Sequence, residues 1–250
     1  LNFLMLLFGS MFVSVLLFAR GVSYLLDHQP VLIWSFFFGL VIASVYSIGR
    51  KLSLTSLETP LAIALGIAIG FSLIHVTPLE SEVSPLVLMA GGCIAVCAWI
   101  LPGLSGSFVL LVLGLYQTVI AAIRDFEVVT LTYVTLGCAI GLISFSRVLA
   151  MLLDRFHNIT ISVLVGFMLG SLSRIWPWKR TTSYLIRQDG SQLPVVQEPV
   201  LPETYYQLTG LDPFLAGAVV SCFFGLLLIL LLDRFALLTE SEPDWHEDRQ

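Results

Sequence analysis

The residues with the clearest chemical potential lie together in one uncharged run, LPGLSGSF, which begins at Leu101. Its proline removes a backbone donor and crowds the carbonyl four residues earlier, so a helix that reaches it is interrupted. Ser105 is a favourable N-cap for a helix that begins near Gly106 and continues to Ile123. Free N–H groups at such a helix start can bind a phosphate or a carboxylate. We therefore take Pro102 as the helix break and Gly103, Ser105, Gly106 and Ser107 as candidate phosphate-binding residues.

Two arginines form a second chemical feature. Arg20 and Arg147 each follow an apolar run directly, and each has an aspartate seven residues later on the same helix face. An arginine at the end of a membrane span can simply extend its charge to the interface. Alternatively it faces an anion, because an intramembrane arginine is costly and a guanidinium matches a phosphate with two hydrogen bonds. The pattern leaves both interpretations open, and Arg20 and Arg147 join the candidate phosphate-binding residues.

A serine nucleophile is the competing interpretation of the same run, because Gly103 to Gly106 fits the GxSG pattern of intramembrane serine proteases. A nucleophilic serine needs a base within hydrogen-bond reach. After Ser105 the only histidines are His157, at a span end, and His246, in the polar tail. The histidines and cysteines also lack metal-ligand spacing. We therefore expect no catalytic residue, no enzymatic activity, no metal and no other cofactor.

The composition indicates that these residues lie in a membrane protein. Of 250 residues, 57% are hydrophobic and 12% are charged, about half the charge density of a soluble domain. This excludes a soluble enzyme, a disordered chain and a basic nucleic-acid binder, so the expected partner is the bilayer and not a nucleic acid. The composition leaves the oligomeric state open, and a homodimer is compatible with it.

The elements that must position the candidate residues are transmembrane helices, since about 20 apolar residues cross a bilayer core. We predict spans at about 1–19, 31–49, 58–75, 128–147, 159–175 and 213–232. Between them, 83–123 is uncharged and interrupted at Pro102 and Gly103. It is either two spans joined by an aqueous turn or a re-entrant segment. We favour the re-entrant segment because LPGLSGSF is short, uncharged and flanked by apolar residues. Trp and Lys in the loop that follows Arg174 suit a membrane–water anchor.

An internal repeat is the strongest long-range pattern. Leu16 to Ser44 aligns without gaps onto Ile143 to Ser171 at a fixed offset of 127 residues, which pairs Arg20 with Arg147 and Gly39 with Gly166. The copies are separated by three or five crossings, both odd, so they have opposite orientation. Inverted repeats with broken helices are typical of secondary transporters. The predicted fold class is therefore all-α, a polytopic helical membrane protein with inverted-topology repeats and broken or re-entrant helices.

The predicted organisation is one membrane domain, 1–238, followed by a polar acidic tail, 239–250. Repeat one covers 1–82 and repeat two covers 83–238. The offset places the repeat-one counterpart of LPGLSGSF about 25 residues before Leu1. We therefore expect the N-terminal part of repeat one to be missing from this chain.

The runs LPGLSGSFVLLVLGLY, FFFGLVIAS and LLFARGVSYLLDH resemble the bacterial undecaprenyl-phosphate translocase family, over roughly 1–235. The family motif maps onto Pro102, Gly103, Ser105, Gly106 and Ser107. The resemblance implies a flippase that returns undecaprenyl phosphate, the C55 lipid carrier, across the cytoplasmic (inner) membrane for the synthesis of peptidoglycan and other envelope polymers. One departure is the absence of the family's earlier PGxSGG-type motif. The alternative function is a small-anion transporter or channel that uses the same site.

Overall fold

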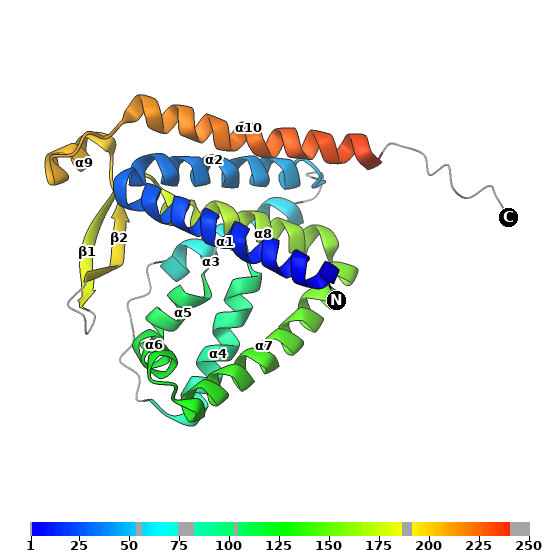
Figure 1. Ribbon diagram of the computed structural model, residues 1–250. Helices are drawn as coiled ribbons and strands as arrows, with labels where there is room; N and C mark the ends of the chain where they lie inside the picture. The colour runs from blue at the N-terminus through cyan, green and yellow to red at the C-terminus, as the bar shows by residue number, and fades with distance from the viewer. Residues whose placement is uncertain (1, 54–56, 75–82, 103–104, 187–191, 241–250) are drawn as a thin grey trace. The chain divides into compact units, whose positions relative to one another are not determined.

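The computed structural model describes residues 2–53, 57–74, 83–102, 105–186 and 192–240. The chain order of the helices and strands is shown in Figure 1. The elements are α1 (Asn2–His28), α2 (Pro30–Gly49), α3 (Glu58–Ile74), α4 (Pro85–Ile100), α5 (Gly106–Val112), α6 (Tyr116–Arg124), α7 (Val128–Arg155), α8 (His157–Ser171), the 3₁₀ helix η1 (Leu172–Ile175), β1 (Lys179–Ile186), β2 (Gln192–Pro199), α9 (Pro202–Thr209) and α10 (Leu215–Glu240).

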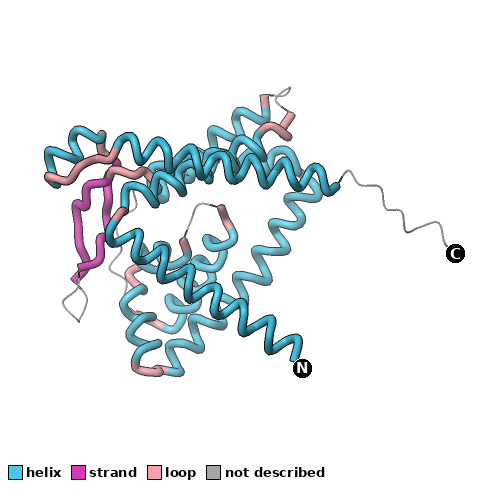
Figure 2. The backbone as a smooth tube through the Cα atoms, turned by 45° about the horizontal axis from the view of Figure 1, so that its top comes forward, coloured by secondary structure: helices cyan, strands magenta, loops and turns pink. Residues whose placement is uncertain are grey.

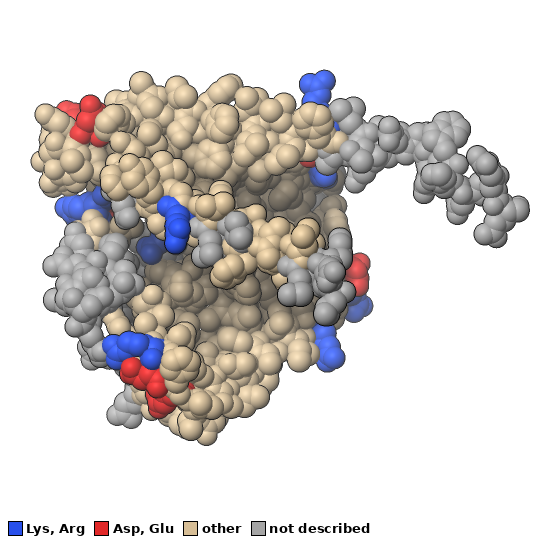
Figure 3. All heavy atoms as spheres, viewed as in Figure 1, with Lys and Arg blue, Asp and Glu red and all other residues tan. Residues whose placement is uncertain are grey.

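The prediction of a polytopic helical membrane protein is confirmed. Among the described residues, five helical segments are long and apolar enough to cross a membrane: Leu6–Leu26, Pro30–Gly49, Val128–Arg155, His157–Ile175 and Leu215–Phe235. The bent pair α5–α6 forms a sixth candidate if it counts as one span. On the face drawn in Figure 3, charged side chains form a few separate groups on a surface that is otherwise uncharged.

One small sheet adds to the all-α prediction. Strands β1 and β2 form a two-stranded sheet within the segment that the sequence assigned to a polar loop (Figure 2). An ion pair of 2.9 Å between Arg180 Nη2 and Glu198 Oε2 joins the start of β1 to the end of β2. The hairpin lies outside the apolar spans, so it does not change the fold class.

The chain forms two compact units. The first contains Leu1–Ser44, Ile175–Arg180 and Glu198–Gln250, and the second contains Val45–Arg174 and Thr181–Gln197. Each unit is therefore assembled from segments that are far apart in the sequence.

The first unit is built on direct backbone contact between α2 and α10, which run side by side in Figure 1. Gly39 lies against the carbonyl oxygen of Cys222, and Gly225 lies against that of Phe36. Further toward the start of both helices, Ser221 Oγ donates a 2.8 Å hydrogen bond to the carbonyl of Leu32. The Leu32–Ser221 contact precedes the Phe36–Gly225 contact on both helices, and Figure 1 draws the two helices in the same direction, so α2 and α10 run parallel.

The second unit contains the same arrangement between α3 and α8. Gly166 lies against the carbonyl oxygen of Ile63, and Gly66 lies against that of Val163. The offset of 127 that relates the repeats takes Gly39 to Gly166 and Phe36 to Val163. The partner residues on the other helix of each pair are related by a second constant offset, which takes Ile63 of α3 to Cys222 of α10 and Gly66 to Gly225. Both contacts of one helix pair therefore have an equivalent in the other, and the repeat found in the sequence is also a repeat of packing.

Substitution of the paired glycines tests this packing. In Gly39→Ala and Gly166→Ala the added Cβ would meet a backbone carbonyl oxygen, which cannot move unless a whole helix shifts. We expect each variant to lose at least about 2 kcal/mol of stability, measured as a lower unfolding temperature of the detergent-purified protein. Gly21→Ala is the matched control, because a Cβ there has no neighbour within 4 Å and alanine favours a helix. Equal unfolding temperatures for all three variants would contradict the packing described.

Candidate functional site at the broken helix

Helix α4 leads to the break, and α7 fixes its direction. Gly137 lies against the carbonyl oxygen of Met89, and a Cβ added at Gly141 would lie 2.6 Å from that of Cys93. Because the contacts advance together along both helices, α4 and α7 run parallel. The chain between them must therefore return to the side on which α4 began.

The length of α4 agrees with a segment that enters the membrane and returns. Its 16 residues span about 24 Å, less than the roughly 30 Å of a bilayer's hydrocarbon core. The parallel direction of α4 and α7 is compatible with both alternatives, whereas the bend of 113° between the short helices α5 and α6 also favours the re-entrant prediction.

The break itself lies where the sequence predicted. Helix α4 ends at Ile100, and Leu101 is extended with φ −76° and ψ 130°, the conformation that a following proline imposes. Pro102 is half-buried, and the next helix, α5, begins at Gly106. Gly103 lies outside the described residues.

The helix after the break is shorter than predicted, and this corrects the sequence analysis. We predicted one helix from Gly106 to Ile123. The structure ends α5 after seven residues and continues as α6 at an angle of 113°. Gly114 makes the bend with φ 72°, a region that favours glycine. Leu115 holds it in place, because its side chain is 1% exposed and packs against Gly91 of α4.

Three of the predicted residues come together at the start of α5. Gly106 allows close contact with α4, since a Cβ there would lie 2.7 Å from the carbonyl oxygen of Ala95. Ser105 occupies the N-cap position, but its hydroxyl makes no cap hydrogen bond. Instead Ser105 Oγ and Ser107 Oγ lie 2.7 Å apart, and both side chains are exposed. The break therefore presents two adjacent hydroxyl groups.

Arg20 and Arg147 lie inside their helices and not at the ends. Both are exposed, and each has eight more helical residues after it, because α1 continues to His28 and α7 to Arg155. From the sequence we predicted that both spans end at these arginines. Their charges are therefore carried within long helices.

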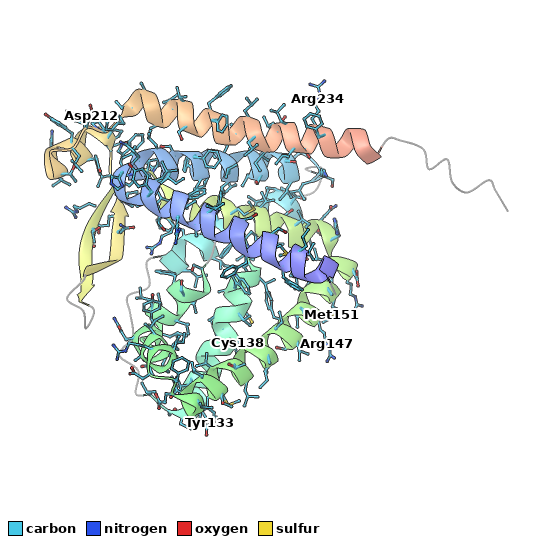
Figure 4. All side chains as sticks on the ribbon, viewed as in Figure 1. Tyr133, Cys138, Arg147, Met151, Asp212 and Arg234 are labelled. Carbon is cyan, nitrogen blue, oxygen red and sulfur yellow. The ribbon has the colours of Figure 1, made fainter. Side chains whose placement is uncertain are left out.

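Arg147 does not lie beside the serine pair. Cys138 of α7 faces α4, where its Sγ donates to the carbonyl of Gly92 at 3.3 Å. Arg147 is nine residues later, which is half a rotation around a helix, and its side chain extends away from α4 in Figure 4. The structure thus brings together Ser105, Gly106 and Ser107, while Arg147 occupies another face of the same unit and Arg20 belongs to the first unit.

A different arginine reaches α5, and sequence reasoning missed it. The Cζ of Arg174 lies 4.5 Å from the ring centroid of Phe108, on the first turn of α5. Arg174 is half-buried and lies in η1, the short 3₁₀ helix that directly follows α8. The sequence analysis placed it at the start of a polar loop. The only local signal was that the apolar pattern of α8 continues through Ile175.

The tryptophans after Arg174 are hydrogen-bonded and packed within the first unit. Trp176 Nε1 donates to the carbonyl of Val200 and Trp178 Nε1 to that of Pro213, each at 2.9 Å. Trp178 is buried with Val31 and Tyr205. Both tryptophans also border an apolar cavity of about 330 Å³.

A larger cavity of about 810 Å³ lies in the same unit, between α1 and the pair α2–α10. Its lining is mostly aliphatic and aromatic, and its polar side chains are the hydroxyls of Ser14 and Ser221. Space of this kind suits an apolar chain.

Comparison with known proteins places the chain in a family. The family model described as undecaprenyl phosphate translocase-like matches residues 1–193. A polyprenyl-phosphate transporter of Vibrio cholerae is 38% identical over 234 residues, 94% of this chain and 76% of the relative. One from Staphylococcus aureus is 32% identical over 176 residues, 62% of this chain and 61% of the relative. No solved structure matches. With more than three quarters of its length matched by the family model, this chain belongs to the undecaprenyl phosphate translocase-like family.

Proposed function

We propose that this protein transports undecaprenyl phosphate across the bacterial cytoplasmic membrane and so returns the lipid carrier for envelope polymer synthesis. The observation that carries the proposal is the broken helix, where two exposed hydroxyls lie side by side at the turn of a re-entrant segment. The names of the Vibrio and Staphylococcus relatives agree with this substrate class.

The phosphate headgroup is bound at the break. Hydroxyl groups donate strong hydrogen bonds to an ionised phosphate, and Ser105 and Ser107 offer two within 2.7 Å of each other. Gly106 keeps the backbone close to α4 at this point, and Gly103 belongs to the same motif. Arg147, which does not lie beside the serine pair, and Arg20 are proposed as further guanidinium contacts of the phosphate at other stages of transport. Each charge within an apolar helix is stabilised when an anion approaches it.

The apolar cavities favour a lipid over a small ion. A channel for a small anion needs a polar lumen. The described cavities of the first unit, of about 330 and 810 Å³, are instead lined mainly by apolar side chains. A prenyl chain fits such surroundings better than a small anion does. The small-anion transporter is therefore the second candidate.

Transport requires no covalent chemistry at Ser105. Its hydrogen-bond partner is the hydroxyl of Ser107, which is not a general base that could activate a nucleophile. We therefore propose a transporter that is not an enzyme.

Leaflet-resolved labelling tests the function directly. In cells without this protein and without a redundant carrier, undecaprenyl phosphate should accumulate in the outer leaflet, because its return is blocked. The measurement is binding of a membrane-impermeant probe for the phosphate to intact cells. Equal labelling with and without the protein would count against the proposal.

The serine pair is tested by Ser105→Ala, alone and together with Ser107→Ala. Loss of one hydrogen bond to a charged phosphate costs about 1.5–3 kcal/mol at most, and Ser107 can compensate in part. We expect a roughly threefold lower transport rate for the single variant and a larger loss for the double variant, in liposomes with a labelled prenyl phosphate. Ser144→Ala is the control, since that exposed hydroxyl donates only within its own helix, to the carbonyls of Ile140 and Gly141. A double variant as active as the control would remove the serines from the site.

The two repeat-related arginines are tested in the same assay. Arg20→Ala and Arg147→Ala should each reduce transport at least about tenfold, the loss expected for one charge-assisted contact, while the unfolding temperature stays near that of the wild type. Arg155→Ala, at the exposed end of α7, is the matched control and should transport normally. If both variants fold and transport like Arg155→Ala, neither arginine contacts the phosphate.

A further inference from the structure

We propose that Arg174 is the cation that binds the phosphate of the lipid substrate beside the Ser105–Ser107 hydroxyl pair, an inference that rests on the transport function proposed above. The ligand class is a prenyl phosphate monoester. Three observations support the assignment: the place of the guanidinium, its lack of a carboxylate partner among the described residues, and the weakness of the neighbouring short helix as an anion site.

The guanidinium lies near the N-terminal end of α5, where the serine pair is. Its Cζ is 4.5 Å from the ring centroid of Phe108, and Phe108 follows Ser105 by three residues, so the two are neighbours on the helix surface. Long side chains on a helix lean toward its N-terminus, which carries the Phe108 ring toward the serines. Arg174 therefore lies on the side of α5 where the two hydroxyls are exposed.

The ring leaves the donors of Arg174 available. A guanidinium is planar, and its five N–H groups project from its edge, so an aromatic ring over one face blocks none of them. Contact with an aromatic ring also restricts the motion of the guanidinium, whose fork matches a phosphate with two hydrogen bonds. Phe108 thus acts as a platform that holds the cation in place.

The charge of Arg174 has no counter-ion among the residues that the structure describes. It lies half-buried within the apolar segment His157–Ile175. Within the described part of the chain, its one recorded interaction is with Phe108, and no carboxylate is paired with it. A cation in an apolar segment usually faces a partner or an anion. A phosphate at the serine pair would supply that anion.

The short length of α5 makes a cation necessary. The 18-residue helix predicted from the sequence would have aligned about five turns of peptide dipoles. The actual helix has seven residues, or two turns. A doubly charged phosphate in an apolar surrounding therefore depends on a full positive charge nearby.

The test uses the purified full chain in detergent and the C20 prenyl phosphate as the probe. Prenyl phosphate should raise the unfolding temperature of the wild type in a concentration-dependent way. Arg174→Gln should bind it at least about tenfold more weakly, as expected for loss of a charge-assisted bond. Arg174→Lys should retain part of the affinity. Arg180→Gln is the control, because Arg180 is exposed and paired with Glu198, and it should bind normally.

Two further arms separate a binding role from a structural role. The C20 prenol, which lacks the phosphate, should stabilise wild type and Arg174→Gln equally. An effect of the substitution on prenol binding would assign Arg174 to packing and overturn the proposal. If Arg174→Gln does not fold, Arg174→Lys and Phe108→Leu are measured in its place. Normal prenyl phosphate binding by both of these variants would also overturn the proposal. Inorganic phosphate at the same concentration should give no shift, and an equal Arg174-dependent shift would assign a small-anion site.

Failure of the function and failure of this inference give different results. If the wild type binds prenyl phosphate and Arg174→Gln binds it equally well, transport stands and the role of Arg174 is refuted. If the wild type binds no prenyl phosphate and moves none in liposomes, both proposals fall.

Discussion

Direct backbone contact between parallel helices is the constraint on which the rest of this structure depends. Within a bilayer, lipid tails are as apolar as leucine, so helices gain little from burying apolar side chains and associate through close packing instead. Gly39 and Gly225 give this packing to one unit, and Gly66 and Gly166 give it to the other. Gly137 extends the same principle to α4 and α7. Because α4 is held along α7, the break that follows it has a defined position.

Much of this fold could be predicted from local sequence, because its signals are local. Stretches without charged residues predicted the membrane spans, and Pro102 with its neighbouring glycines predicted the end of α4. The second bend escaped prediction since Gly114 alone allows it, whereas burial of Leu115 against Gly91 fixes it. That contact joins different helices and leaves no mark in either sequence pattern.

The candidate site was only partly predictable for the same reason. The serine pair lies within one motif and was identified, but Arg174 is 66 residues away from Phe108 along the chain. Its neighbours in sequence, two tryptophans and a lysine, suggested an interfacial loop. In the structure both tryptophans are hydrogen-bonded inside the first unit. The role of Arg174 thus depends on its contact with the start of α5, and the composition of the sequence around Arg174 does not predict that contact.

The repeat shapes the scaffold more than the site. The offset of 127 takes Phe36 to Val163 and Gly39 to Gly166, but it takes Arg174 back to Ser47. Packing residues are thus duplicated, while the cation at the broken helix occurs in one copy. This division is physically reasonable, because equivalent helix pairs need equivalent small residues, whereas a cation beside the serine pair is needed only at that break.

Pairing of distant helices also sets the order in which the units are completed as the ribosome makes the chain. Helix α3 finds its partner when α8 emerges, about 100 residues later, so the second unit can close while synthesis continues. Helix α2 must wait for α10, whose Cys222 follows Gly39 by about 180 residues, or roughly 10 to 40 s at about 5–20 residues per second. Throughout that interval its glycine face meets only lipid or a temporary neighbour. A chain that stalls before Leu215 therefore has one closed unit and one that cannot close.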